Sequence, residues 1–262
     1  MTAIALLAVV AGCTTIVPDA APGARHGDPV TAAPQPRPGY TADGALQPWI
    51  EAGHGEIRRV NGAEGCVALT FDDGPHPTLT PRLLALLAEE DVRATFFVVG
   101  SRAQQWPDII RAMNAGGHEI GNHSWNHPDL TQLGNDQVTE QLARTDAAIV
   151  SITGAAPDIV RLPYDASSSR VLSLISRPVI WWDIDTLDWK ATSVGEVVDS
   201  AVRRARSGSI VLMHDIHATT VSAVRGIIEG LRARGFDFVT VSELMTGRPC
   251  RAETVIATAR QG

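Results

Sequence analysis

The chain has 262 residues, 44% of them hydrophobic, which is enough for one or two domains with a sizeable core. Its 22 basic and 29 acidic residues give a formal net charge of −7, which argues against a surface that binds nucleic acid. No apolar run reaches the roughly 18 residues of a membrane-spanning helix, and this argues against a multi-pass membrane protein.

The beginning of the chain resembles an export signal. Residues 3–11 form a short apolar run, which is typical of a signal-peptide core rather than of a transmembrane helix. The run ends in VAGC at residues 10–13, which resembles a bacterial lipobox. We therefore expect residues 1–12 to be removed and Cys13 to carry a lipid that anchors the exported protein to the outer face of the cell membrane. A plain signal peptide and a secreted protein are the alternative.

The next segment has the composition of a tether. Seven of the 16 prolines lie between Pro18 and Pro48, where aliphatic periodicity is almost absent. Such a segment buries too little apolar surface to fold by itself. We expect a tether over residues 13–62, a single folded domain over 63–247 and a short tail over 248–262.

Seven apolar runs inside this domain predict strands. The runs are continuous rather than alternating, as in strands buried on both faces, and helical patterns such as residues 135–151 and 195–206 fall between them. Such alternation predicts a parallel α/β sheet, one unit short of the regular eight-unit barrel. The predicted strands are Val67–Phe71, Ala94–Val99, His118–Gly121, Ile159–Leu162, Val179–Ile184, Ser209–Met213 and Phe238–Val241.

Two adjacent carboxylates, Asp72 and Asp73, follow the first predicted strand and enter a Gly-Pro turn. Aspartate, glycine and proline all favour turns, so turn chemistry alone is one explanation of this motif. Neighbouring carboxylates repel each other, however. A site that holds both therefore needs a cation or a proton close by.

Two histidines, His123 and His127, follow the third predicted strand at a spacing of four residues. This spacing lets both imidazoles bind one metal, although two solvent-exposed loop histidines have the same pattern. No glutamate follows His123, so the metalloprotease pattern is absent. With Asp72 or Asp73 the set becomes two histidines and one carboxylate, which leaves metal positions open, as catalysis requires.

Three further motifs are weak when taken singly: RLPY at 161–164, WDIDTLDW at 182–189 and LMHD at 212–215. The proline of the first stiffens the backbone, so the N–H of Tyr164 could face a reacting oxygen. Arg161 could hold a carboxylate in one orientation, or it could be an ordinary surface residue.

Together and in this order, the five motifs resemble those of the polysaccharide deacetylase family, also called carbohydrate esterase family 4 or the NodB-homology domain. The resemblance covers about residues 66–245. It implies a distorted (β/α) barrel with about seven parallel strands, which agrees with the count of predicted strands. It also implies removal of N-acetyl groups from a polysaccharide that contains N-acetylglucosamine, such as peptidoglycan or a chitin-like glycan. An O-acetyl esterase on xylan and a non-catalytic wall-binding lipoprotein are the alternatives.

The resemblance assigns a role to each motif. Asp72 would be the general base, positioned by Arg161, and Asp73 would bind one divalent metal with His123 and His127. Zinc is the metal expected first, with cobalt or nickel as alternatives.

The same resemblance places the remaining groups around the acetyl group. The backbone N–H of Tyr164 would stabilise the oxyanion, and Asp188 would tune His214, the general acid. Trp182 and Leu212 would form the walls of the pocket for the acetyl methyl group. Family members usually have glycine after the tyrosine, whereas this chain has Asp165, so the loop that carries the oxyanion donor is expected to differ in shape.

Two cysteines remain once Cys13 carries a lipid. Cys66 immediately precedes the first predicted strand, and Cys250 lies shortly after the last one. The first and last strands of a closed barrel are neighbours, and disulfides persist in exported proteins. We therefore predict a bond between Cys66 and Cys250, with two free thiols as the alternative.

Overall fold

The structure is a computed structural model that describes residues 45, 47, 50–52 and 56–250. Cys13 and most of the predicted tether therefore lie outside the described residues. Among the helices in these ranges, none combines the length and the apolar character that crossing a membrane requires.

The centre of the sheet is a pair of parallel strands, β3 (Cys66–Asp72) and β8 (Ser209–His214), in register from Val67 opposite Ser209 onward. Strands β4 (Thr95–Val98) and β5 (Glu119–Asn122) continue the sheet in parallel beyond β3. Because all four strands are parallel, their carboxyl ends lie along the same edge of the sheet, where parallel α/β folds build their sites.

Shorter strands complete the sheet. Antiparallel to β8 lies β2 (Glu56–Val60), and β1 (Ile50–Ala52) is antiparallel to β2 in turn. Strands β6 (Val179–Ile180), β7 (Ile184–Asp185) and β9 (Asp237–Phe238) pair in parallel with β2, β8 and β3 respectively.

The curled sheet closes through one residue, Val160. This residue forms isolated bridges to Asn122 at the end of β5 and to Val179 in β6. Since β6 pairs with β2 and β2 with β8, the pairing runs around a complete circuit. The predicted distorted barrel of mostly parallel strands is thus confirmed.

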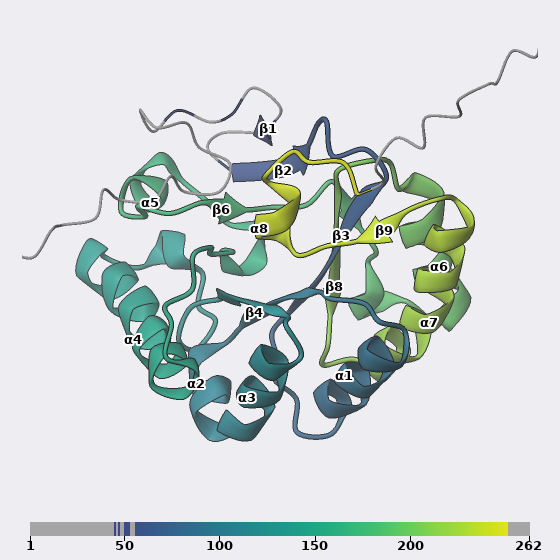
Figure 1. Cartoon of the computed structure of the whole chain (residues 1–262). Helices are drawn as coiled ribbons and strands as arrows, with labels where there is room; N and C mark the ends of the chain where they lie inside the picture. Colours follow the sequence, from purple (N-terminus) through teal and green to yellow (C-terminus); the bar gives the residue numbers. More distant parts are fainter. Residues whose placement is uncertain (1–44, 46, 48–49, 53–55, 251–262) are drawn as a thin grey trace, which may run out of the picture. The chain divides into compact units, whose positions relative to one another are not determined.

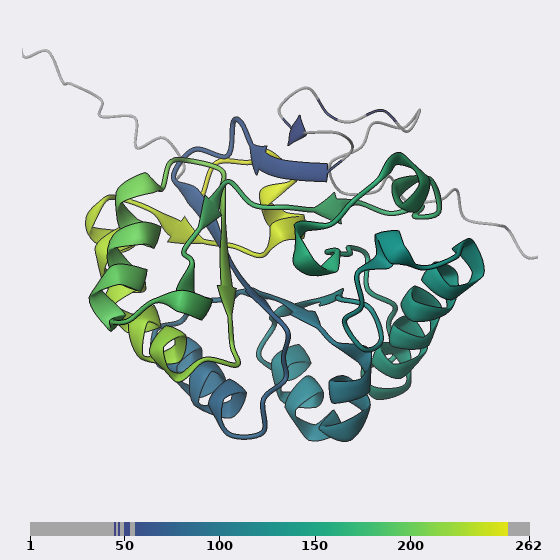
Figure 2. The same ribbon diagram turned by 180° about the vertical axis from the view of Figure 1, so that it is seen from behind.

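The larger helices lie outside the strands and form an arc around them, which is visible in both views (Figures 1 and 2). Helix α6 packs against α7, and α2 packs against α4. The helices are α1 (Leu79–Glu89), α2 (Gly100–Gln105), α3 (Pro107–Ala115), α4 (Asn135–Thr153), α5 (Ser169–Ser173), α6 (Val194–Arg204), α7 (Ala218–Ala233) and α8 (Val241–Leu244), with short 3-10 turns η1 (Leu130–Gln132), η2 (Pro163–Asp165) and η3 (Asp188–Lys190).

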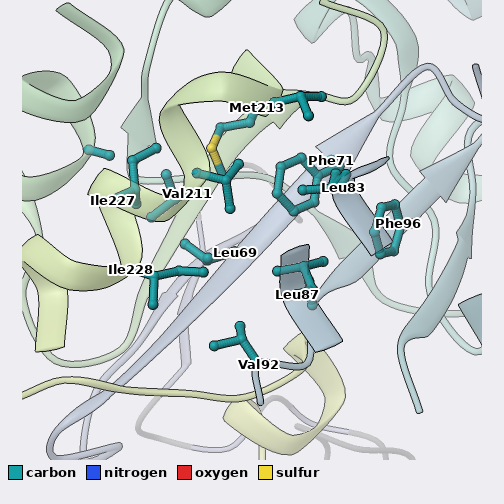
Figure 3. Packing of buried hydrophobic residues seen from close by; sticks show 14 of the residues in the cluster. Leu69, Phe71, Leu83, Leu87, Val92, Phe96, Val211, Met213, Ile227 and Ile228 are labelled. Carbon is teal, nitrogen blue, oxygen red and sulfur yellow. The ribbon is translucent and has the colours of Figure 1, made fainter. Parts of the chain in front are cut away.

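Alternation along β3 separates the core from the site. Leu69 and Phe71 pack with Val211 and Met213 of β8 against the helices, as Figure 3 shows. The intervening residues of β3 point to the inside of the barrel, where Ala68 belongs to a second apolar cluster. The same alternation therefore places Thr70 and Asp72 on the inner face, at the carboxyl end of the strand.

The folded region begins earlier than predicted. Strand β2 lies within residues 13–62, which composition assigned to the tether, yet Ile57 and Val60 are fully buried. Arg58 and Arg59 interrupt the apolar pattern, which is why the strand escaped detection. It forms a strand because it pairs with β6 and β8, which are distant in sequence.

Three predicted strands differ from the structure. In the predicted strand Phe238–Val241 only Phe238 lies in a strand, because β9 ends there and α8 begins at Val241. The stretch Ile159–Leu162 forms only the bridges of Val160, because Pro157 and Pro163, which have no N–H, lie on either side of it. The predicted strand Val179–Ile184 is divided into β6 and β7. Between them the Asp183 carboxylate accepts the Ile210 N–H at 2.8 Å and takes the place of a ladder bond.

The start of α1 is tied to the end of β8 through Thr80. The N-cap is Thr78, and the Thr80 hydroxyl accepts the His76 N–H at 2.7 Å and donates to the carboxylate of Asp215. Thr80 therefore links the turn after the paired carboxylates to the end of β8.

The predicted bond between Cys66 and Cys250 is present, with the two Cα atoms 5.3 Å apart. Helix α8 turns the chain back after β9, and the Cys250 N–H donates to the Glu64 carbonyl at 3.0 Å. The bridge closes a loop with a sequence separation of 184.

Replacing both cysteines by serine should lower the free energy of unfolding by up to about 5 kcal/mol, because a long loop in the unfolded chain is released. Denaturant titration of the oxidised wild type and of the double variant measures the difference. Two titratable thiols in the wild-type protein, prepared under oxidising conditions without reductant, would contradict the bond.

Candidate active site and metal centre

The predicted functional residues gather around one cavity of about 500 Å³ at the carboxyl ends of the central strands. Arg161 and Asp188 lie behind its wall, both buried. The predicted residues that line it are Asp72, Asp73, His123, His127, Tyr164, Trp182, Leu212 and His214, and five more that the motifs did not assign are Leu162, Asp165, Asp185, Trp189 and His217.

Asp72 is held by a buried arginine. The Arg161 guanidinium donates to Asp72 Oδ1 and to the Thr70 hydroxyl, both at 2.7 Å. It also donates to the main-chain carbonyls of residues 180 and 181, at 3.2 and 2.9 Å. With its donors used in this way, Arg161 fixes the Asp72 carboxylate and leaves Oδ2 facing the cavity, 3.8 Å from His123 Nε2.

Asp73 lies between the two histidines. Its Oδ1 is 3.4 Å from His123 Nε2 and 3.0 Å from His127 Nε2, and the three ligand atoms lie within 4.8 Å of one another. Asp73 Oδ1 is buried and has no hydrogen-bond partner among the described residues. A buried carboxylate oxygen without a donor, facing two imidazole nitrogens, fits a divalent cation with open coordination positions.

The tautomer of His123 suits metal binding. Its Nδ1 lies 2.8 Å from the Arg161 carbonyl oxygen, which can only accept a hydrogen bond. The Nδ1 atom therefore carries a proton, and Nε2, which faces Asp73, offers its lone pair to a metal ion when the ring is neutral. A second hydrogen bond of this kind is the usual way in which proteins orient a metal-ligating histidine.

The electrostatics of this group also favour a cation. Burial alone would lower the pKa of His123, but the charges of Asp72 and Asp73 raise it. Burial would likewise raise the pKa of Asp73, yet its interactions with His123 and His127 lower it well below its usual range. The carboxylates thus attract positive charge, and a proton and a metal ion compete for the same place.

The segment that carries the histidines is held by residues that the motifs did not identify. The buried Asn122 side chain accepts the Ser124 N–H at 2.8 Å and donates to the Leu142 carbonyl at 2.9 Å. The Ser124 hydroxyl accepts the His127 N–H at 3.1 Å. The predicted strand ends at Gly121, directly before Asn122. This position was the only signal in the sequence that Asn122 holds the histidine segment.

His214 and Asp188 form a second charged pair. His214 Nδ1 lies 2.8 Å from Asp188 Oδ1, and the His214 N–H and the Thr220 hydroxyl donate to Oδ2 at 2.7 and 2.6 Å. Burial alone would lower the pKa of His214, but the hydrogen bond and charge of Asp188 raise it to about 9. His217 also lines the cavity, but its ring packs edge-on against His214 at 6.0 Å between centroids.

Backbone strain is concentrated at the site. Asp73, His127, Tyr164 and Asp165 all have positive φ, between 59° and 73°, although none is glycine. Such conformations cost free energy and persist at functional sites because surrounding contacts determine them. For Asp73 one of these contacts is Arg102, which donates to the Asp73 carbonyl at 2.7 Å.

The mouth of the cavity is aromatic. The side chains of Tyr164 and Trp189 are 66% and 57% exposed, and the Tyr164 ring packs against His127 at 4.5 Å between centroids. Exposed aromatic faces at a pocket rim suit stacking on an apolar face of a ligand. Asp165 keeps the left-handed conformation that glycine would adopt without strain, with φ of 59°.

Known proteins are similar to this chain in sequence. Residues 59–177 match the family described as polysaccharide deacetylase. The peptidoglycan-N-acetylglucosamine deacetylase PgdA of Listeria monocytogenes is 42% identical over 178 residues, which are 68% of this chain and 38% of that protein. The chitooligosaccharide deacetylase of Azorhizobium caulinodans is 33% identical over 201 residues, which cover 70% of this chain and 95% of the relative.

A solved structure of another deacetylase is similar to this fold. The peptidoglycan deacetylase PdaC from Bacillus subtilis matches with a TM-score of 0.68 and 39% identity, over 72% of this chain and 93% of that one. The chain therefore belongs to the polysaccharide deacetylase family, as its motifs indicated. It spans only 38% of the length of the Listeria relative.

We expect the purified chain to bind one divalent ion, and His123→Ala to lose tight binding, because a buried ligand is removed while Asp73 and His127 remain. Metal analysis after dialysis, with dissociation constants from a competing chelator, measures this. Replacing His217 in the same way is the control, since its ring packs against His214 and it is not one of the three grouped ligands. Stoichiometric metal in His123→Ala would place the ion elsewhere.

Proposed function

We propose that the protein is a metal-dependent hydrolase that removes N-acetyl groups from a polysaccharide containing N-acetylglucosamine, with zinc as the metal and peptidoglycan as the substrate. The main support for this proposal is that the two adjacent carboxylates in the cavity have different partners. One carboxylate, Asp72, is fixed by an arginine, and the other, Asp73, faces two imidazole nitrogens. A divalent ion at Asp73 supplies a polarising charge and lowers the pKa of a bound water toward ~7.

Asp72 has the geometry of a general base. Arg161 occupies its Oδ1, so Oδ2 is the atom that accepts a proton from an attacking water in the cavity. The bond to Arg161 also holds the carboxylate in one orientation. The N–H of Tyr164, at the strained turn η2 beside His127, is the candidate donor to the oxyanion of the acetyl carbonyl.

His214 has the geometry of a general acid. Its Nδ1 is bound to Asp188, which leaves Nε2 as the atom that donates a proton to the leaving amine. The raised pKa of His214, about 9, keeps the ring protonated at neutral pH. Trp182 and Leu212 line the same cavity and form the apolar walls that an acetyl methyl group requires.

Acetate release from purified peptidoglycan and from N-acetylglucosamine oligomers, with and without chelator, tests the function. We expect release that chelation abolishes and added zinc restores. Release from acetylated xylan but from neither amide substrate would identify an O-acetyl esterase instead. Binding to cell-wall glycan without any acetate release would identify a non-catalytic wall protein.

Asp72→Asn should retain one metal ion and lose about 10²–10⁴-fold in turnover, because the base is removed while the ligands remain. Asp73→Asn is the matched variant on the neighbouring residue, and metal affinity should fall there first. Acetate release and bound metal are measured on the same preparations. Wild-type turnover in Asp72→Asn would contradict its role as the base.

The activity should depend on the protonated form of His214, so the rate should fall as pH rises through the pKa of that residue. Asp188→Asn removes the charge that raises this pKa, and the alkaline limb of kcat/KM should therefore shift to lower pH. Asp185→Asn, which removes another carboxylate of the cavity, is the control and should leave the limb in place. An unchanged profile in Asp188→Asn would count against the pair.

We also propose that the mature chain is exported and anchored through lipid on Cys13 to the outer face of the membrane. The lipobox-like residues 10–13 support this, and so does the disulfide, since such bonds persist outside the cytosol. Lipid on Cys13 would supply the two or more acyl chains that stable anchoring needs. Wild-type protein found only in the culture medium, with an N-terminus other than Cys13, would overturn this proposal.

A further inference from the structure

The two histidines of the proposed metal site are joined by three residues, Ser124–Asn126, which form neither a helix nor a strand. Both Ser124 and His127 have positive φ, 64° and 62°. A segment strained at two non-glycine positions keeps its shape only if neighbouring elements hold it. The spacing of the two imidazole rings therefore depends on contacts from outside the segment.

One side of the segment is held by the start of helix α2. The N–H groups of Gly100 and Ser101 donate to the carbonyls of Ser124 and Trp125, at 3.0 and 2.9 Å. A Cβ atom at Gly100 would lie 2.7 Å from the Trp125 ring, so helix and segment are in direct contact. These bonds fix the carbonyl groups of the segment but leave its N–H groups to another partner.

Asn122 accepts the N–H of Ser124, and the N–H groups of Trp125 and Asn126 are held by one further side chain, Gln141 of helix α4. Its Oε1 accepts the N–H groups of Trp125 and Asn126, at 2.9 and 3.2 Å. Its Nε2 donates to the Asn126 side-chain oxygen at 2.7 Å. Both ends of one amide group thus bind the residues between the two histidines.

We propose that Gln141 is a positioning residue for the metal centre, which holds the Trp125–Asn126 main chain so that His123 and His127 face Asp73 before an ion binds. This inference rests on the proposed metal site. Gln141 is neither one of the grouped metal ligands nor a lining residue of the catalytic cavity, so it acts through the two histidines. Loss of such an outer partner typically weakens metal binding about 10–100-fold.

The same helix supplies a matched control. Gln137 lies one turn before Gln141, and its amide oxygen accepts the Gly134 N–H at 3.0 Å, at the start of its own helix. Gln137→Ala therefore weakens the capping of α4 and leaves the bonds to Trp125 and Asn126 intact. Gln141→Glu keeps the oxygen that accepts these N–H groups, and rotation of the Asn126 amide supplies a donor to the new carboxylate.

The experiment titrates the metal-free full chain with Co²⁺ and Zn²⁺, and records the Co²⁺ absorption spectrum and the thermal midpoint of each apo variant. Gln141→Ala should raise the Kd for both ions about 10–100-fold and change the Co²⁺ spectrum. Gln141→Glu and Gln137→Ala should bind as the wild type does. The apo midpoint of Gln141→Ala should fall no further than that of Gln137→Ala.

Wild-type Kd values and a wild-type spectrum in Gln141→Ala would overturn the positioning role. An equal loss of affinity in Gln137→Ala would also overturn it, because the effect would then belong to the helix. If the wild type binds neither ion, the metal site itself is wrong, and that result is distinct from the failure of Gln141 alone.

Discussion

The site depends on one fully buried side chain, Arg161. A guanidinium inside a protein is costly unless it is paired and hydrogen-bonded, and Arg161 meets this requirement with Asp72, Thr70 and two main-chain carbonyls. Its own carbonyl accepts the Nδ1–H of His123. The residue therefore orients the proposed base through its side chain and a proposed metal ligand through its backbone.

This arrangement resolves the repulsion between two adjacent carboxylates. The alternation of β3 turns Asp72 toward the inside of the barrel and toward Arg161, whereas Asp73 begins a strained turn and faces His123 and His127. Each carboxylate thus has its own partner groups, Arg161 for Asp72 and the two imidazoles for Asp73, and the two need not share one. A third pair, formed by Asp188 and His214, stands at the end of the neighbouring strand β8.

Sequence patterns predicted the parts of this site that lie at strand ends, because parallel strands bring their carboxyl ends together. They also predicted the barrel and the bond between Cys66 and Cys250. They did not predict Asn122, Gln141 or Thr220. The partners of these residues on other elements, Asp146, Trp125 and Asp188, lie 16 to 32 residues away along the chain and leave no local signal. The same reason explains β2, since a strand with two arginines is recognised only once β6 and β8 lie beside it.

Arg161 orients Asp72 through its side chain and His123 through its main-chain carbonyl. One variant tests directly whether these two functions are separable. Lysine at this position has one donor group and cannot bind Asp72 and both carbonyls together, while the main-chain bond to His123 remains. Acetate release and zinc content of Arg161→Lys, measured on one folded preparation, should show turnover reduced at least about 100-fold with one zinc retained. Wild-type turnover, or loss of zinc from a folded variant, would contradict the account.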